Sequence, residues 1–219
     1  SFGPAPNLRV IAALYTEPFT VLARRDSGIA RFEDLAGRRV DIGHPSSGRR
    51  ATMEVAMARF GMTHDTFAEV QELQAGAVLS ALCDGRIDAT VLTLGHPSAL
   101  VARALEQCDA ALVPVVGPRI DDLLRENPAY IRTVIRPAVY GSRAAPVATF
   151  GVTALLLTTA AMDDAVVETF ARALIDGAAA LARDEAVLNT LSPAYMAQAD
   201  ALIPLHPAAR RAMDAAPPR

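Results

Sequence analysis

The sequence predicts an α/β fold in which two lobes are joined by two crossing strands. Residues 40–116 alternate strand and helix four times, which is typical of a parallel or mostly parallel sheet with right-handed crossovers. Within this block Ile87–Leu94 is almost continuously apolar, as expected for a strand buried on both faces. Apolar strands before and after the block indicate a chain that leaves one lobe, builds a second and returns to the first.

This chain order predicts the boundaries of the two lobes. We expect one lobe to contain residues 1–23 and 146–219, and the other to contain residues 24–145. The crossing segments Glu17–Ala23 and Ala148–Thr153 would then form the hinge. The first lobe has one strand before the crossing and one after it, so we expect part of it to lie upstream of this sequence.

The first part of the chain predicts strands, a turn and a helix. Apolar runs at Leu8–Leu14 and Thr20–Ala23 predict two extended segments, and Phe32–Gly37 predicts one helical turn that ends at its glycine. A strand at Arg39–Ile42 is followed by a Gly/Pro/Ser turn. The helix that begins near Ser47 repeats apolar residues at three- and four-residue spacing and stops at glycine 61.

The middle part repeats this alternation. Phe67–Leu73 and Ala110–Val116 predict strands on either side of the buried strand at residues 87–94. Gln74–Asp84 predicts a helix with one apolar face that stops at the following glycine. Pro97 suits the first turn of a helix that continues to about residue 107.

The last part is less regular. Ile120–Glu126 predicts a short helix, and Tyr130–Pro146 an irregular segment. The strong strand Phe150–Thr159 precedes a long helix at residues 163–183. Residues 184–201 predict further helix with a break at Ser192-Pro193, and the Ala-, Arg- and Pro-rich tail from Pro207 is expected to fray.

Composition excludes several classes of function. The 219 residues are 52% hydrophobic and carry a net charge of −3 without a long basic block, so nucleic-acid binding is disfavoured. No window reaches the roughly 18 uninterrupted apolar residues of a membrane span. The chain opens without a signal-peptide pattern and without a native-looking start, so we expect a processed or truncated product.

The segment Gly43–Thr52 (GHPSSGRRAT) is the best candidate site. A turn between a strand and a helix leaves the first N–H groups of the helix unpaired, and together with the helix dipole and Arg49 and Arg50 they suit a small anion. The alternative is that Ser46 or Ser47 only caps the helix and the arginines are solvated. A second Gly/Pro turn, Gly95-His96-Pro97, lies at the same sheet edge, where such sheets bind ligands.

The sequence contains no catalytic signature. Ser47 and His96 could approach each other across the sheet edge, but no GxSxG, phosphate-loop, Rossmann or metal-protease motif occurs. The acidic pairs Asp121-Asp122 and Asp163-Asp164 lie at helix starts, where carboxylates complement the dipole. Two cysteines are too few for a zinc site, so they are either two buried thiols or one disulfide. We expect a binding cleft with no catalytic residue, metal or cofactor.

Several motifs resemble those of a known family. They are LYTEPF (14–19), GHPSSGRRATME (43–54), ALCDGRIDA (81–89), TLGHPS (93–98), the Cys-Asp pair at 108–109 and TFGV (149–152). In this order and spacing they are similar to the TAXI family, the extracytoplasmic solute-binding components of tripartite (TRAP) transporters. The resemblance covers most of the chain to about residue 180.

The resemblance implies a fold and a function. TAXI proteins have the type II periplasmic-binding fold, two α/β lobes joined by crossing strands. They deliver a small organic anion, such as glutamate, glutamine or a dicarboxylate, to membrane permease subunits. We therefore expect a monomeric periplasmic receptor whose signal peptide has been removed and whose first segment, which contributes part of the cleft, is absent from this sequence.

The resemblance also implies a set of site residues. The expected ligand-binding residues are Tyr15, Ser46, Ser47, Gly48, Arg49, Arg50, Thr52, Thr93, Gly95 and His96. Tyr15 is equally well interpreted as a buried hinge aromatic. The family more often has Asn-Pro-Gly-Ser-Gly-Gln at the turn, so His44, Ser46 and Arg49 are departures, and the added arginine favours a ligand with an extra carboxylate. In an envelope protein, Cys83 and Cys108 become an expected disulfide.

Two other classes of function remain as alternatives. The first is an enzyme on the same fold, a transferase or a pyrimidine-precursor synthase, for which His96 is the single candidate for a catalytic group. The second is a cytoplasmic effector-sensing domain, which would lack the disulfide and carry a DNA-binding helix pair upstream. The sequence leaves the identity of the ligand open.

Overall fold

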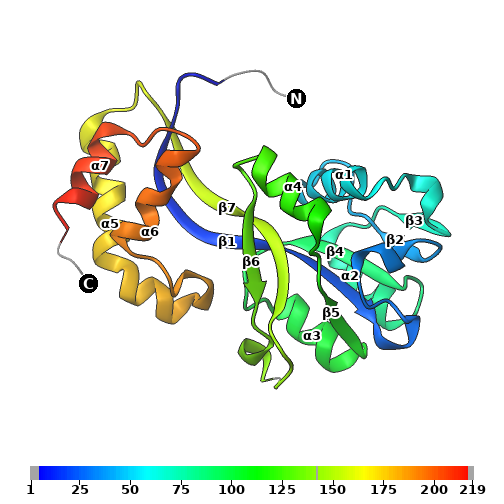
Figure 1. Ribbon diagram of the computed structural model, residues 1–219. Coiled ribbons are helices and arrows are strands. Elements are labelled where there is room, and N and C mark those ends of the chain that lie inside the picture. The colour runs from blue at the N-terminus through cyan, green and yellow to red at the C-terminus, as the bar shows by residue number, and fades with distance from the viewer. Residues whose placement is uncertain (1–4, 142, 217–219) are drawn as a thin grey trace. The chain divides into compact units, whose positions relative to one another are not determined.

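A computed structural model describes residues 5–141 and 143–216 (Figure 1). The chain forms two compact units: the first contains the residues up to Thr16 and from Thr153 onward, and the second contains Glu17–Val152. Two long strands, β1 (Leu8–Arg24) and β7 (Val147–Thr159), continue from one unit into the other. The unit boundaries therefore lie inside these strands, and not at residues 23/24 and 145/146 as the sequence predicted, because the second half of β1 pairs with strands of the second unit.

The sheet is mixed, which confirms the predicted α/β class. Its strand order is β3-β2-β4-β1-β7-β6, and β5 also pairs with β1. Its shorter strands are β2 (Arg39–Asp41), β3 (Glu69–Gln71), β4 (Ala89–Thr93), β5 (Ala110–Val113) and β6 (Ile131–Ile135). β2 is parallel to β3 and β4, whereas β1 is antiparallel to β4 and β5. The carboxyl ends of β2, β3 and β4 consequently lie at one edge of the sheet.

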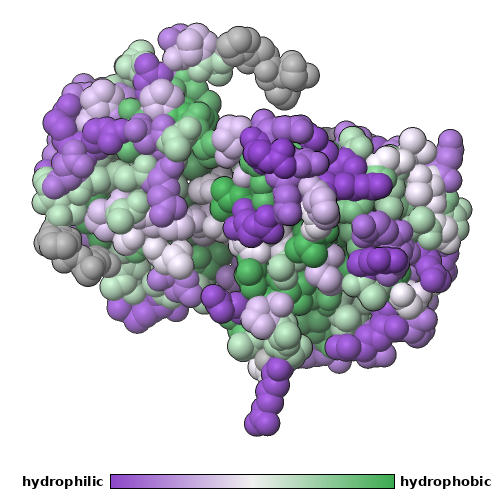
Figure 2. All heavy atoms as spheres, in the orientation of Figure 1, coloured by the Kyte–Doolittle hydropathy of each residue, from purple (hydrophilic) through white to green (hydrophobic). Residues whose placement is uncertain are grey.

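Helices cover both faces of the sheet in the second unit. They are α1 (Gly48–Phe60), α2 (Ala75–Cys83), α3 (Ala99–Gln107) and α4 (Pro118–Glu126). On β1, Val21 packs in the cluster that includes α1 and α4, and the next residue, Leu22, packs in the cluster that includes α2 and α3. Successive side chains of a strand point to opposite faces of the sheet. Because consecutive residues of β4 are buried, this strand is covered on both faces, as predicted. Hydrophilic side chains gather on the outer surfaces of α1 and α4 (Figure 2).

The first unit is built around a long helix. Its helices are α5 (Asp164–Asp184), α6 (Pro193–Ala197) and α7 (Pro207–Asp214). Buried residues of α5, among them Val167 and Ala171, pack with the first half of β1 and with α7. Within the described part of the chain, no helix is long and apolar enough to cross a membrane.

Four predicted elements differ from the structure. Leu8–Leu14 and Thr20–Ala23 belong to one continuous strand, β1, and the segment predicted to be irregular contains β6. Residues 184–201 form short 3₁₀ turns and α6 in place of a longer helix. In the tail, Pro207–Asp214 form α7, whose first turn is capped by His206 and whose small alanines are buried beside α5; residues 217–219 lie outside the described residues.

The two cysteines form the disulfide Cys83–Cys108. Cys83 is the last residue of α2, and Cys108 directly follows α3. The bond therefore joins the C-terminal ends of two neighbouring helices on the same face of the sheet.

Candidate functional site

The start of α1 leaves two backbone donors without a partner. Ser47 is the N-cap, and its Oγ accepts a hydrogen bond from the Arg50 amide at 3.3 Å. The Gly48 and Arg49 amides, which precede Arg50, have no acceptor among the described residues. The predicted capping by Ser47 is therefore present together with free N–H groups, because one cap side chain satisfies only part of a helix start.

A second helix start, which the sequence analysis missed, has the same property. α2 follows β3 at the same sheet edge, and its N-cap, Gln74, makes no side-chain capping bond. The Ala75 and Gly76 amides also have no acceptor among the described residues. The signal in the sequence was the second strand–helix junction of the alternating block, whose helix begins at the carboxyl end of a strand parallel to β2.

Both helix starts line one cavity of about 600 Å³. Its lining residues all belong to the second unit. They are Glu17, His44, Ser47, Gly48, Arg49, Thr52, Leu73, Gln74, Ala75, Thr93 and Val152. The positive ends of two helix dipoles therefore converge on one space, an arrangement that stabilises negative charge.

Thr93 is a lining residue of this cavity with a buried side-chain hydroxyl. It is the last residue of β4, and its Oγ1 atom is buried without a hydrogen-bond partner among the described residues. A buried hydroxyl without a hydrogen-bond partner costs free energy. A ligand that hydrogen-bonds to Thr93 would recover that cost.

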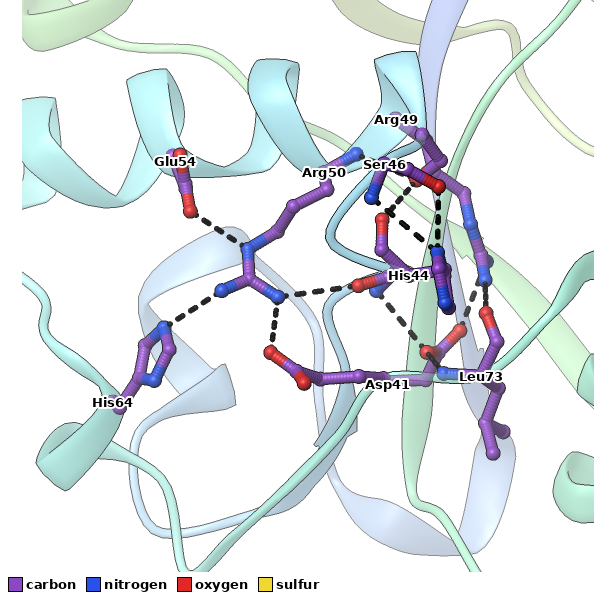
Figure 3. Close-up of polar contacts among 11 residues, drawn as sticks. Asp41, His44, Ser46, Arg49, Arg50, Glu54, His64 and Leu73 are labelled. Atoms are coloured by element: carbon purple, nitrogen blue, oxygen red, sulfur yellow. Dashed lines mark hydrogen bonds and ion pairs between the residues drawn. The ribbon is translucent and has the colours of Figure 1, made fainter.

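Arg49 lines the cavity, but its guanidinium is occupied by the protein. It forms a buried ion pair with Asp41, with Nη1 at 2.9 Å from Oδ2, and donates to the carbonyl oxygen of Leu73 (Figure 3). It also donates to the carbonyl oxygen of Val91 at 3.1 Å. The alternative in which the arginines are solvated is therefore wrong for Arg49, which is 8% exposed. The sequence did not show which acceptors the fold brings to it.

Arg50 is also buried and paired, and it does not line the cavity. It donates to Glu54 at 2.8 Å, to Glu72 at 2.5 Å and to the Gly43 carbonyl oxygen at 3.2 Å (Figure 3). The hydrogen bond from Arg50 holds the pKa of Glu72 below its ordinary value. Its contacts explain why this arginine is not solvated: it fastens α1 to the segment that follows β3.

His96 lies away from the cavity. Its Nε2 is 2.9 Å from Thr20 Oγ1, and its Nδ1 is 2.5 Å from the Tyr140 hydroxyl. Because Thr20 Oγ1 donates to the Pro18 carbonyl, His96 Nε2 donates to Thr20 and Nδ1 accepts from Tyr140. Burial lowers the pKa of His96 to about 4, which keeps the ring neutral, and raises the pKa of Tyr140 to about 12.

The other predicted site residues divide into two groups. Thr52 lines the cavity, although its hydroxyl donates to the Gly48 carbonyl at 3.2 Å. Ser46 is exposed and hydrogen-bonds to His44 Nδ1 at 2.8 Å. Neither Gly95 nor Tyr15 is a lining residue, and Tyr15 belongs to the other unit.

In chemical terms the site supplies donors for an anion. The cavity combines four backbone N–H groups at two helix starts with one hydroxyl. Its two charged lining side chains are Glu17 and the internally paired Arg49. Within the described residues, no group of three or more His, Cys, Asp or Glu side chains is placed to hold a metal ion.

Comparisons with known proteins complete this description. The model of the NMT1-like family matches residues 1–214. Among solved structures, the periplasmic aliphatic sulphonate binding protein SsuA from Escherichia coli is 16% identical, with a TM-score of 0.48; the match covers 96% of this chain and 56% of that protein. An ancestral arginine-binding protein bound to arginine is 12% identical, with a TM-score of 0.46 and coverage of 84% and 62%. The chain thus spans about 56 to 62% of these structures' lengths.

Proposed function

The chain belongs to the NMT1-like family, and from this premise we propose that it is an extracytoplasmic solute receptor for a small carboxylate. The observation that carries the proposal is the cavity of about 600 Å³ at which the N-termini of α1 and α2 meet. A volume of this size suits a small metabolite. The free N–H groups and the Thr93 hydroxyl are donors of the kind that a carboxylate accepts.

The proposed ligands are glutamate, glutamine or a related dicarboxylate. The preference for an extra carboxylate, which rested on Arg49, loses its basis because Asp41 already neutralises that guanidinium. We therefore expect one carboxylate to bind at the two helix starts, and we expect no strong discrimination between glutamate and glutamine by Arg49.

The proposed partner is the permease of a TRAP transporter. This assignment rests on the TAXI-like motifs, and membership of the NMT1-like family is compatible with it. The disulfide between α2 and α3 supports a periplasmic location, because disulfides persist in oxidising compartments. No observation favours a second function, since both ring nitrogens of His96, the one catalytic candidate, are engaged within the protein.

Titration calorimetry with L-glutamate, L-glutamine and succinate tests the proposal. We expect at least one of these to bind the full chain with a dissociation constant in the micromolar range. Thr93→Val keeps the shape of the side chain and removes its hydroxyl, so affinity should fall roughly tenfold, the equivalent of about 1.4 kcal/mol.

Thr158 provides a matched control, because it is another buried threonine whose hydroxyl lacks a partner among the described residues, and it lies outside the cavity. Thr158→Val should leave the dissociation constant unchanged. Absence of binding by all three carboxylates, or equal effects of the two valine substitutions, would contradict the proposed site.

A further inference from the structure

One buried ion pair, Asp41–Arg49, connects the three segments of the cavity wall that carry hydrogen-bond donors: the start of α1, the start of α2 and the end of β4. Asp41 is fully buried and Arg49 nearly so. Removing two charges from water is costly, and burial of such a pair is weak grounds for assigning it a stabilising role alone. The hydrogen bonds that the two side chains make to the backbone indicate what else the pair does.

Asp41 binds the segments that precede both helices. Its Oδ1 atom accepts from the Gly43 amide at 3.1 Å, just before α1, and from the Leu73 amide at 2.9 Å, just before α2. Its Oδ2 atom accepts from the Thr90 hydroxyl at 2.7 Å, on β4. A single carboxylate therefore fixes three separate segments of the chain.

Arg49 holds the same segments from the other side. Its Nη2 atom donates to the Leu73 carbonyl, and its Nη1 atom donates to the Val91 carbonyl at 3.1 Å as well as to Asp41. Leu73 lies two residues before Ala75, whose amide is free, and Val91 lies two residues before the cavity hydroxyl of Thr93. Arg49 itself lies in the first turn of α1. In each of the three segments, the residue that contacts or carries the guanidinium therefore lies within two residues of the hydrogen-bond donor that faces the cavity.

Gly43 shows how closely the turn is fitted to the Arg49 side chain. Its φ angle is 89°, and a Cβ atom at this position would lie 2.9 Å from Arg49 Cγ. Any other residue would be strained in this conformation and would also push the arginine stem aside. Glycine at position 43 therefore leaves the space through which the Arg49 side chain reaches Asp41.

We infer that Arg49 is a positioning residue: with Asp41 it sets the spacing between the start of α1, the start of α2 and the end of β4, and it does not itself bind the ligand. The expected effect on ligand affinity rests on the proposed function, whereas the effect on the backbone does not. A site made of separate donors must be held to within about 0.5 Å to act together. The planar guanidinium is suited to this because it donates in several fixed directions at once.

The test compares Arg49→Lys with wild type by amide hydrogen exchange and by titration with L-glutamate. Lysine keeps the charge opposite Asp41, but its single ammonium cannot reach Asp41, Leu73 and Val91 together. We expect exchange of the Gly43 and Leu73 amides to accelerate together by about tenfold, and L-glutamate affinity to fall by about tenfold. Asp41→Asn, which keeps the shape of the carboxylate, should accelerate exchange of the same two amides.

Arg39→Met is the matched control. Arg39 lies at the other end of β2 and pairs with Asp88 beside β4, away from the cavity. This variant should change neither the exchange of the Leu73 amide nor L-glutamate affinity by more than about twofold.

Three outcomes would overturn the inference. One is a uniform rise in exchange throughout the second unit of Arg49→Lys, which would indicate general destabilisation. Another is an equal effect of Arg39→Met. The third is a loss of binding in Arg49→Lys with unchanged exchange at Gly43 and Leu73, which would mean that Arg49 contacts the ligand. If wild type binds none of L-glutamate, L-glutamine and succinate, the proposed function fails, but the hydrogen-exchange measurements still test the inference. If it binds one of the other two, the affinity comparison uses that ligand.

Discussion

The tetrapeptide Gly-His-Pro-Ser occurs twice in this chain, at residues 43–46 and 95–98, and the two copies have different structural roles. Both follow strands, β2 and β4, that end at the same edge of the sheet. In the first copy His44 lines the cavity and hydrogen-bonds to Ser46 in its own turn. In the second, His96 is held by Thr20 of β1 and by the hydroxyl of Tyr140.

The difference arises from residues distant in sequence. Beside the first turn the fold places Asp41 and Arg49, which bind each other and leave the histidine at the cavity wall. Beside the second it places two hydroxyl groups that match the two nitrogens of a neutral imidazole. Identical local sequence at equivalent strand ends can thus line a cavity in one copy and form buried structural hydrogen bonds in the other.

The largest effect is expected from breaking the ion pair beside the first turn. Asp41→Ala leaves Arg49 buried without its carboxylate, and loss of one partner of a buried pair costs about 3–5 kcal/mol. Urea unfolding followed by circular dichroism measures this change. A loss below about 1 kcal/mol would mean that water replaces the carboxylate and that the pair does not fix the turn.

The second turn should be the one that responds to pH. The pKa of His96 is about 4 in the folded protein against an ordinary value of 6.5, so as pH falls the unfolded chain takes up this proton first. The neutral His96 ring therefore contributes to the free energy of unfolding, on the order of 2–3 kcal/mol. This contribution is complete above about pH 6.5 and is lost as the pH falls towards 4. Unfolding free energies at several pH values should show this loss in wild type and in His44→Gln, and a flatter profile in His96→Gln. Parallel profiles for the two glutamine variants would contradict it.

The hydroxyl of Tyr140 should contribute less. It donates to His96 and accepts from the Ser98 amide at 3.0 Å, so Tyr140→Phe leaves two polar groups unsatisfied at a cost of about 1–2 kcal/mol. In a double-mutant cycle with His96→Gln, the two effects should be less than additive because they share a hydrogen bond. Strict additivity of the unfolding free energies would show that the two side chains are not coupled.

The smallest effect is expected at the first histidine. Among the described residues, the His44 ring hydrogen-bonds only to Ser46 in its own turn, so His44→Ala should change the free energy of unfolding by no more than about 0.5 kcal/mol. Chemical denaturation of this variant beside His96→Ala gives the direct comparison of the two turns. A larger loss at His44 than at His96 would reverse the roles assigned here.

The sequence predicted most of the alternating second unit because its helices carry local signals. The helix predicted from Ser47 begins at Gly48 after a Ser47 cap, and it ends at Gly61 in a left-handed conformation. The failures lie where tertiary contacts decide. β6 is held by pairing with β7, and α7, although it begins with a His206 cap and Pro207, is held by small side chains packed beside α5.

The candidate site was predicted in part for the same reason. The helix start at Ser47 and Gly48 and the strand end at Thr93 were visible as local junctions, and the structure places all three at one cavity. The partners of the arginines were not visible, because Asp41, Leu73 and Val91 reach Arg49 only through the fold. The sequence showed two positive charges, but not that both are already paired.

The disulfide restricts how α2 can move. Near its N-terminus the helix is tied to Arg49 through Leu73, and at its C-terminus Cys83 is covalently joined to Cys108. Because this nine-residue helix is restrained at both ends, its orientation is fixed and the positive end of its dipole stays directed at the cavity. Reduction would remove the covalent restraint at the C-terminal end of α2, whereas the hydrogen bond from Arg49 to Leu73 would still restrain the end that faces the cavity.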